Sequence, residues 1–443
     1  MRPGRRQLYL IACWALLALV LALLRPWVSL AYADILTLLW WSAGGLFVVL
    51  LGVDLARHRK NHEIKVSRQM PGSFSLGAIN VVTLRIENPY ARALHVTVYD
   101  QYPAHVQVDV FPYGLIIPAN EYSEIRYQAQ PTLRGDAEFG KTELRILSYW
   151  KLWESHRKQG NSAIVKVYPN FTNIGALSML EHSQQINQLG IHVQQRRGEG
   201  INFHQLREYR KGDSLSQIDW KATSRYVKLI SRGYEDERDQ DIIFLLDCGR
   251  RMRALDGELS HFDHALNALL LMSYMALKQG DAVGVLSFAG ETRWIPPMKG
   301  PTAINKLLNN VYDLHSTTNT SDFLQAVEQL IVHHRKRALV IVLSNIREED
   351  QQDLLAATRT LSKHHLVMVA SLREQFLDQA TTTPVANFES ALRYSGVQQL
   401  MEQRKRVLDA LVDRGIVITD SLARNLHVDL TNQYLKLKRS GRI

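Results

Sequence analysis

The densest group of chemically active side chains in the sequence lies between residues 207 and 225. Five basic residues crowd around two carboxylates there, namely Arg207, Arg210, Lys211, Lys221 and Arg225 around Asp213 and Asp219. This mixture of charges favours an ion-paired clasp that holds the segment to the α/β sheet domain, with a partner- or ligand-binding surface as the second interpretation. No nucleophile–base pair is recognisable among these residues, so catalysis is the least favoured of the three.

Elsewhere the sequence lacks the common catalytic signatures. It contains no Gly-x-Ser-x-Gly elbow, no Walker loop, no His-Glu-x-x-His motif and no cysteines spaced for zinc. The two cysteines, Cys13 and Cys248, fit a reducing compartment. Two histidine pairs, His333–His334 and His364–His365, stand beside basic or helical sequence and are interpreted as solvated. We therefore predict no catalytic residue and no enzyme activity.

Two apolar runs near the N-terminus are the first structural elements that the sequence predicts. Leu8–Leu24 and Ile35–Val53 each reach the roughly 17–20 residues that cross a hydrocarbon core. The short link Arg25–Asp34 between them predicts a transmembrane helical hairpin within residues 1–60. A signal peptide cleaved near Ala31–Ala33 and a hairpin buried in a protein core are the alternatives.

Basic residues set the expected orientation of this hairpin. They flank its two ends and almost avoid the link: Arg2, Arg5, Arg6, Arg57, Arg59, Lys60 and Lys65 against Arg25 alone. The positive-inside rule therefore predicts that both ends and the soluble body lie in the cytoplasm.

The formal net charge of the chain is +10, which we interpret as a basic face near anionic lipid head groups. Nucleic-acid binding is disfavoured, because no basic segment is interleaved with aromatic residues. The basic C-terminus, Leu435–Ile443, is interpreted as a solvated tail that could touch anionic lipid.

The soluble part shows two different hydrophobic periods. Residues 62–169 alternate apolar and polar side chains over short runs such as Val81–Ile86 and Leu94–Tyr99, which predicts a small antiparallel β-sandwich. Residues 241–443 alternate apolar strands with helices, which predicts a doubly wound, mostly parallel α/β domain. Residues 170–240 form a connector between them that contains the charged segment.

The α/β prediction rests on particular runs. The expected strands are Ile242–Leu246, Ala282–Phe288, Ala338–Leu343, Leu366–Ala370 and Ile416–Ile418. The expected helices are His261–Lys278, Thr302–Leu314, Asp322–His333, Glu349–Ser362 and Gly396–Arg414. Trp294 and the prolines after it resemble an edge strand and its turn.

The segment GEGINFHQLREYRKGDSLSQIDWKATSR, from Gly198 to Arg225, resembles the signature of a bacterial family of unknown function, the fifty-eighth such family by number. The positions that match are Gly200, Phe203, Leu206, Arg207, Tyr209, Gly212, Asp213, Ile218, Asp219, Trp220 and Arg225. Gln217 and Ser224 depart from it, since the family commonly has Arg and Ala there. The resemblance implies a two-helix anchor in the bacterial inner membrane, a β-rich module and a von Willebrand factor A-like domain.

Such a domain usually binds a divalent cation above its first strand, through an Asp-x-Ser-x-Ser loop, a threonine and a later aspartate. Under the resemblance, Asp247 keeps the first ligand, whereas Gly249 and Arg251 replace the two serines. Thr320 or Ser321 can still offer a hydroxyl, and Asn345 replaces the later carboxylate. Mg²⁺ wants about six oxygen ligands, and a guanidinium nearby would repel it.

We therefore expect a degenerate site without metal, where Arg250 or Arg251 supplies the positive charge. The simpler alternative is that Asp247 caps the following helix or pairs with Arg251. Retained Mg²⁺ is disfavoured, and no other cofactor is expected.

Taken together, these features predict a non-enzymatic, membrane-tethered interaction protein. The family is often encoded beside MoxR-type AAA+ ATPases, which the resemblance implies as the cytoplasmic partner in a chaperone-like or cell-envelope-related assembly. A metal-dependent ligand-binding protein and a component of a transglutaminase-like membrane system are the alternatives.

Overall fold

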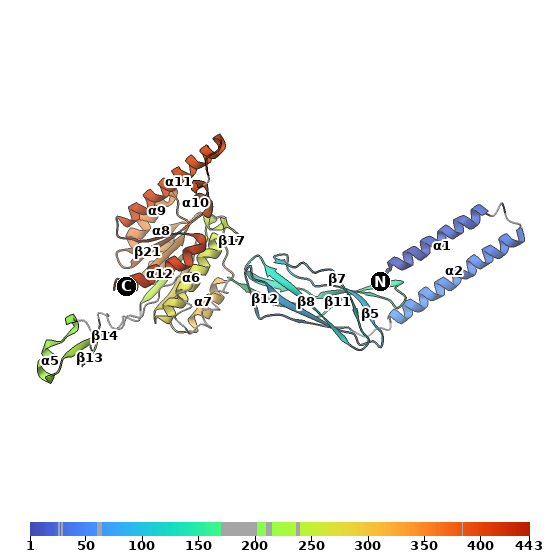
Figure 1. The fold of residues 1–443 in the computed structure, drawn as a ribbon, viewed down its shortest axis with the longest axis horizontal. Coiled ribbons are helices and arrows are strands. Elements are labelled where there is room, and N and C mark those ends of the chain that lie inside the picture. Colours follow the sequence, from blue (N-terminus) through green and yellow to red (C-terminus); the bar gives the residue numbers. More distant parts are fainter. Residues whose placement is uncertain are drawn as a thin grey trace. The chain divides into compact units, whose positions relative to one another are not determined.

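The computed structural model describes residues 1–24, 27, 30–59, 64–169, 202–209, 215–235, 240–382 and 384–443. The chain divides into two compact units, Met1–Tyr168 and Pro169–Ile443 (Figure 1). The first unit contains the apolar helices and the β-rich module, and the second contains the charged segment and the α/β domain. The expected order of fold classes is therefore confirmed.

The first unit begins with two antiparallel helices, α1 (Arg5–Leu24) and α2 (Leu30–Arg59) (Figure 1). Both are long and apolar enough to cross a membrane. The most apolar 18-residue stretch has a mean hydropathy of 2.4 in α1 and of 2.0 in α2. The ring of Trp14 stacks on that of Trp40 with centroids 4.2 Å apart, and it lies so close to Gly44 that a Cβ there would clash. Only 6% of this apolar stretch is buried in each helix, which argues against a hairpin inside a protein core.

The β-rich module follows as short strands in three sheets. Its strands are β2 (Lys65–Gln69), β3 (Ser73–Ser75), β4 (Asn80–Glu87), β5 (Leu94–Tyr99), β6 (Val106–Gln107), β7 (Tyr113–Ile117), β8 (Tyr122–Pro131), β9 (Gly135–Phe139), β10 (Thr142–Leu147), β11 (Trp153–Gln159) and β12 (Ala163–Tyr168). The N-terminal strand β1 (Arg2–Pro3) adds to β11, giving the order β1-β11-β10-β5-β7 beside β2-β4-β8-β6 and β3-β12-β9. All pairs are antiparallel except β3–β12. Alternate side chains of β4 and β8 are buried, as the period of two predicts.

The charged segment of the second unit forms a hairpin. Strands β13 (Asn202–Glu208) and β14 (Ile230–Glu235) pair antiparallel, and between them lie a short 3₁₀ turn and helix α5 (Trp220–Tyr226). Asp219 caps α5, because its carboxylate accepts a hydrogen bond from the Ala222 backbone N–H at 3.0 Å.

The α/β domain is built on a six-stranded sheet in the order β19-β18-β15-β20-β21-β22. The strands are β15 (Asp241–Asp247), β18 (Ala282–Phe288), β19 (Trp294–Met298), β20 (Ala338–Ser344), β21 (Leu366–Arg373) and β22 (Val417–Leu422), and only the edge strand β19 is antiparallel. Its helices are α6 (His261–Lys278), α7 (Ala303–Val311), α8 (Phe323–His333), α9 (Gln351–Leu361), α10 (Gln375–Thr382), α11 (Phe388–Val412) and α12 (Leu426–Arg439).

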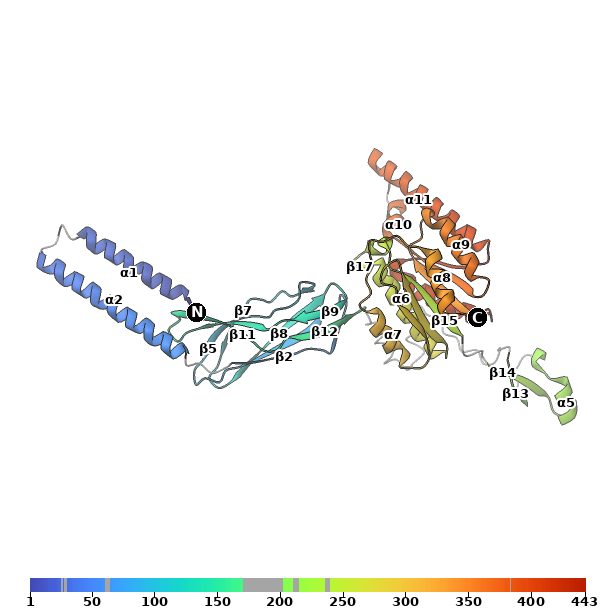
Figure 2. The ribbon, with the colours of Figure 1, turned by 180° about the vertical axis from the view of Figure 1, so that it is seen from behind.

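Both faces of this sheet are covered (Figure 2). Side chains such as Phe244 pack into one apolar cluster with α6, α7 and α12, and neighbours such as Leu245 pack into another with α8, α9 and α11. Continuous burial along β15, β18 and β20 explains why their sequences are apolar without alternation.

Three expectations about this domain are wrong. The C-terminus is no solvated tail: α12 runs to Arg439 with Tyr434, Leu435 and Leu437 buried, because it covers α6. His365 is buried rather than solvated. Helix α11 begins at Phe388, before the expected Gly396, because Asn387 caps it there.

Candidate functional site

The candidate site lies where the strand order of the sheet reverses. After β15 the chain moves outward to β18 and β19 and then returns to the other side of β15 as β20. Loops that follow neighbouring strands diverge at such a point and leave a crevice at their carboxyl ends. Asp247 ends β15, and Ser344 and Asn345 end and follow β20.

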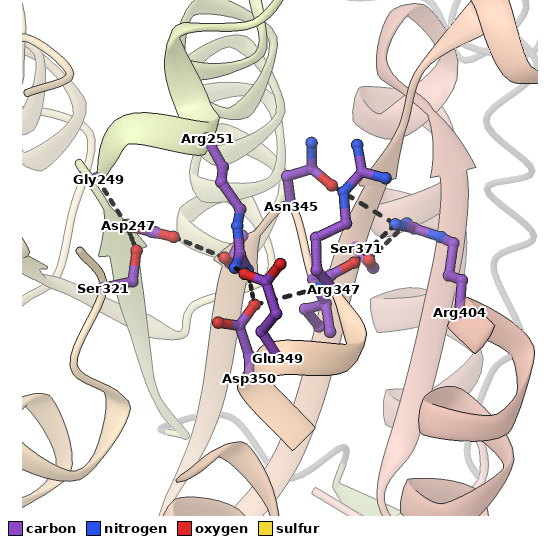
Figure 3. A network of polar contacts seen from close by, with 12 residues as sticks. Asp247, Gly249, Arg251, Ser321, Asn345, Arg347, Glu349, Asp350, Ser371 and Arg404 are labelled. Carbon is purple, nitrogen blue, oxygen red and sulfur yellow. Dashed lines mark hydrogen bonds and ion pairs between the residues drawn. The ribbon is translucent and has the colours of Figure 1, made fainter. Parts of the chain in front are cut away.

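The carboxylate of Asp247 is buried and closely surrounded by donors from its own chain (Figure 3). One oxygen accepts hydrogen bonds from the Gly249 backbone N–H and the Ser321 hydroxyl, each at 2.7 Å. The other oxygen accepts one from the Ser344 hydroxyl at 2.6 Å. Burial raises the pKa of Asp247, although these three hydrogen bonds and the charge of Arg251 partly offset that effect.

Gly249 is required by this arrangement. A Cβ at this position would lie 2.3 Å from the Ser321 hydroxyl oxygen and 2.9 Å from a carboxylate oxygen of Asp247. Its φ of −76° is ordinary, so space and not backbone conformation demands glycine. Thr320 is exposed, and the hydroxyl that reaches Asp247 from this loop is that of Ser321.

The Arg251 guanidinium takes its carboxylate partners from the start of the α9 region. It forms ion pairs with Asp350 and Glu349, and its side chain is mostly buried (Figure 3). Asp350 also accepts a hydrogen bond from the Arg347 backbone N–H at 3.1 Å. The three hydrogen bonds to Asp247 therefore come from neutral groups, whereas Arg251 ties the β15 loop to the β20 loop.

Asn345 opens a second polar network beside the first. Its amide nitrogen donates to Glu374 at 2.9 Å and lies 3.2 Å from Nδ1 of His261. Arg404 of α11, 5% exposed, donates to the backbone oxygen of Ile346 at 2.9 Å and pairs with Asp420 at 2.7 Å. Sequence inspection missed Arg404; its position on the core side of a helix next to Val407 was the available signal.

Two titratable groups of this network have shifted pKa values. Burial lowers the pKa of His261, against the opposing charge of Glu374. For Glu374, burial acts to raise the pKa, but the Asn345 hydrogen bond and the Arg347 charge outweigh it and lower the pKa. At neutral pH the network therefore holds a neutral imidazole and an ionised carboxylate.

The donors around Asp247 do not fit a resident Mg²⁺. They comprise a single carboxylate and two hydroxyls that already bond to it, and Asn345 is bonded elsewhere. The position of the missing first serine, Gly249, has no room for a side chain. Magnesium needs about six oxygens in an octahedral array, so this set falls short in number and in charge. Among the described residues no group of three or more His, Cys, Asp or Glu could hold a metal ion.

The predicted motif residues are only partly brought together. Gly212 and Asp213 lie outside the described residues. Asp219 caps α5, Arg207 and Tyr209 are half-buried, and Arg225 is exposed. Trp220 is the first residue of α5 and is 68% exposed, although large aromatic side chains are commonly buried.

An open cleft of about 650 Å³ lies beside the second network, between the ends of β20 and β21 and helices α10 and α11. We call it the β20–β21 cleft; its lining residues are Leu255, Asp256, Gly257, Arg347, Glu374, Gln375, Phe376, Leu377, Gln379 and Leu400. Leu255, Phe376 and Leu400 are 73%, 54% and 41% exposed, which is unusual for apolar side chains that share one depression.

Known proteins resemble parts of this chain. An uncharacterized protein of Bacillus subtilis (strain 168), YeaD, is 22% identical over 149 residues, which is 34% of this chain and 35% of that protein. The chain thus matches about a third of the length of this relative.

Solved structures match more weakly. An aerotolerance-related membrane protein from Bacteroides fragilis NCTC 9343 is 14% identical with a TM-score of 0.27, over 44% of this chain and 98% of that one. Salmonella alpha-2-macroglobulin reacted with methylamine is 13% identical with a TM-score of 0.19, over 24% and 7%. Neither likeness carries an argument about function.

A family model agrees with the predicted resemblance over the charged hairpin and most of the α/β domain. Residues 205–406 match the model described as "Protein of unknown function DUF58". This segment of the chain, somewhat less than half of its length, is therefore similar to the DUF58 family.

Proposed function

We propose that this chain is a non-enzymatic, membrane-tethered interaction protein that presents the β20–β21 cleft to a cytoplasmic protein partner. The observation that carries the proposal is the contrast between two neighbouring places in the crevice. Asp247 is closed off by donors of its own chain, whereas the adjacent cleft exposes Phe376 and Leu255 to solvent. Apolar side chains gathered in an open depression favour contact with another protein.

Polar groups of the cleft indicate which partner chemistry it would accept. Buried oxygens of Asp256 and Glu374 have no hydrogen-bond donor within the described part of the chain. These oxygens have almost no accessible surface, so a donor from a partner would reach them only after the side chains turned toward the cleft. A basic side chain flanked by apolar residues would satisfy both the carboxylates and the exposed apolar wall.

The resemblance to the DUF58 family suggests a MoxR-type AAA+ ATPase as that partner, in a chaperone-like or cell-envelope-related assembly. A von Willebrand factor A-like domain would use the carboxyl ends of its strands for this contact. A metal-dependent binding mode is less favoured, since Gly249 leaves no space for a serine ligand. A role in a transglutaminase-like membrane system would need a partner in the same membrane.

Site-specific crosslinking in intact cells tests the proposal. A photo-crosslinking amino acid at Phe376 should trap a discrete partner, while the same amino acid at Val332 of α8, 74% exposed, is the matched control. Mass spectrometry of the adduct then identifies the partner with and without nucleotide. Equal crosslinking at the two positions, or none at Phe376, would contradict the cleft as the docking site.

Enzyme activity is tested separately. The purified protein should not hydrolyse generic ester, phosphate or peptide substrates faster than they hydrolyse in buffer without protein. Turnover that disappears on substitution of a cleft residue such as Glu374→Gln would refute the non-enzymatic assignment.

A further inference from the structure

A second depression lies in the first unit, where the two apolar helices meet the β-rich module. It is an open depression of about 690 Å³, within the range of about 300–1,000 Å³ that is common for ligand pockets. We call it the membrane-side pocket, and its walls come from both helices and from the loop between β10 and β11: Arg6, Tyr9, Leu10, Phe47, Leu50 and Trp150. One guanidinium thus stands against otherwise apolar and aromatic surface.

The loop that carries Trp150 is held rigidly. Asp54 of α2, 1% exposed, accepts a hydrogen bond from the Ser148 hydroxyl at 2.5 Å and from the Trp150 backbone N–H at 3.4 Å. The Trp153 indole N–H donates to the Leu51 backbone oxygen at 3.1 Å. These contacts fix the loop against α2, so the pocket exists before any ligand arrives.

The N-terminus closes the same loop from the other side. The Gly4 backbone N–H donates to the Leu152 oxygen at 2.7 Å, and a Cβ on Gly4 would lie 2.7 Å from the Lys151 oxygen. Arg6, in the first turn of α1, is thereby brought to the rim of the pocket. Preorganisation of this kind lowers the entropic cost of binding.

The buried Asp54 carboxylate lies at this end of the unit, but its hydrogen bonds come from Ser148 and Trp150 and not from the guanidinium groups there. Neither Arg6 nor Arg57 forms an ion pair with any carboxylate of the described residues. The Arg57 guanidinium instead lies over the Trp150 ring, 5.9 Å from its centroid. Burial lowers the pKa of the nearby His95, and the charges of Lys151 and Arg6 lower it further, which reports the same positive field.

We propose that the membrane-side pocket binds one anionic phospholipid, with its phosphate beside Arg6 and its acyl chains against Leu10, Phe47 and Leu50. The guanidinium at the rim and the apolar walls of the pocket match an amphiphile with an acidic head group and apolar chains. Trp150 lies where an indole prefers the boundary between head groups and hydrocarbon. The inference rests on the insertion of α1 and α2 in a membrane, and does not depend on the β20–β21 cleft.

Native mass spectrometry of the full chain, purified in detergent, tests this binding. The protein is offered equal amounts of phosphatidylglycerol and phosphatidylcholine with identical acyl chains. We expect one phosphatidylglycerol to be retained in clear preference. Equal retention of the two lipids would overturn the proposal, and this comparison uses the unaltered chain, so it does not depend on the folding of a variant.

Two variants locate the site. Arg6→Gln should weaken retention of phosphatidylglycerol about fivefold, as expected for one basic residue near the surface. Arg126→Gln on β8, an exposed arginine with the same change in charge, is the matched control and should leave retention unchanged. An equal loss in both variants would mean that only net charge matters, and would overturn the pocket.

A water-soluble competitor separates a lipid from a free phosphate. Glycerol 3-phosphate should not displace the bound lipid, because it lacks the chains that contact the apolar walls. Displacement at equal concentration would overturn the assignment to a lipid. The crosslinking experiment at Phe376 has a different readout, so failure of either proposal can be told from failure of the other.

Discussion

At the scale of single residues, the crevice shows how a buried carboxylate can be kept without a cation. An isolated charge in the protein interior is costly, and its usual remedies are a counter-ion or several hydrogen bonds. Asp247 takes the second course through Gly249, Ser321 and Ser344. The Ser321 hydroxyl stands where the side chain of a residue at position 249 would otherwise reach. The absence of a side chain at position 249 therefore leaves the space in which the Ser321 hydroxyl bonds to Asp247.

Restoring a serine in the loop should damage the site instead of rebuilding it. In Gly249→Ser the new Cβ would lie 2.3 Å from the Ser321 oxygen, and we expect a loss of about 1–3 kcal/mol in the free energy of unfolding. Denaturant unfolding of the full chain in detergent measures this loss. Gly396→Ser, where a Cβ meets no atom within 4 Å, is the control.

A second substitution makes that prediction specific. Ser321→Ala in the Gly249→Ser background removes the clashing hydroxyl and should recover part of the loss. Additive effects of the two changes would show that they do not contact each other, contrary to the geometry.

The raised pKa of Asp247 gives its contribution a definite dependence on pH. Because burial raises the pKa of the folded carboxyl above its ordinary value of 3.8, the folded protein binds more protons than the unfolded chain at pH values between the two. Stability therefore falls as the pH rises through that interval, by about 1.4 kcal/mol for each pH unit that separates the folded and unfolded pKa.

Asp247→Asn removes this titration while keeping the shape of the side chain. The stability of the variant relative to the unaltered protein should increase from pH 3.5 to pH 7. Parallel unfolding measurements of the two proteins across this range check it. A relative stability that stays constant, or that decreases towards pH 7, would contradict a raised pKa.

At the scale of elements, α12 is an integral part of the α/β domain. The Tyr434 hydroxyl donates to Asp281, and the Lys438 ammonium pairs with the same carboxylate at 2.7 Å. Asp281 is 1% exposed and lies just before β18, so α12 is fastened to the base of the sheet. Burial and hydrogen bonding of the Tyr434 hydroxyl by Asp281 raise its pKa, so the phenol stays protonated as a donor.

Tyr434→Phe should therefore lower the free energy of unfolding by about 1–3 kcal/mol, because Asp281 loses a buried donor. Tyr394→Phe is a matched control: its hydroxyl accepts a hydrogen bond from the Gln398 side chain at 3.1 Å on an exposed surface. The same denaturant experiment compares the two. A change at Tyr434 no larger than that at Tyr394 would mean that α12 is held by its apolar contacts alone.

The limits of sequence-based prediction follow from the environments of particular elements. The runs that became β15, β18 and β20 were recognisable because both of their faces are buried. Helix α12 was not predicted, because its last turn is rich in basic residues and suggests a solvated tail. Its apolar face is buried only through packing against α6. Arg404 and Glu374 both bond to Asn345, which comes from a different part of the chain, and the sequence around each residue does not predict this shared partner.

In the charged hairpin, too, the burial of a single side chain could not be predicted from the local sequence. A tryptophan is normally expected to be buried, but Trp220 opens α5 and points to solvent. Tyr226 and Val227 of the same hairpin are also exposed. Burial of these side chains could therefore not be predicted from their apolar character alone.

At the scale of the whole molecule, the orientation expected of the two apolar helices predicts which compartment the rest of the chain would face. Basic residues stand at one end of the hairpin, and two of them, Arg6 and Arg57, lie in or beside the membrane-side pocket. The same charges that are expected to bind acidic lipid are those that the positive-inside rule uses. The expected orientation and the proposed lipid binding therefore draw on the same group of basic residues.

Reporter fusions test the orientation directly. Alkaline phosphatase, which is active only outside the cytoplasm, should be inactive when fused after Ile443 and active when fused after Trp27, in the link between the helices. A green fluorescent protein should give the opposite pattern, because both ends of the hairpin carry the basic residues. Phosphatase activity after Ile443 would move the β20–β21 cleft out of reach of any cytoplasmic ATPase, and the search for a partner would then shift to the opposite side of the membrane.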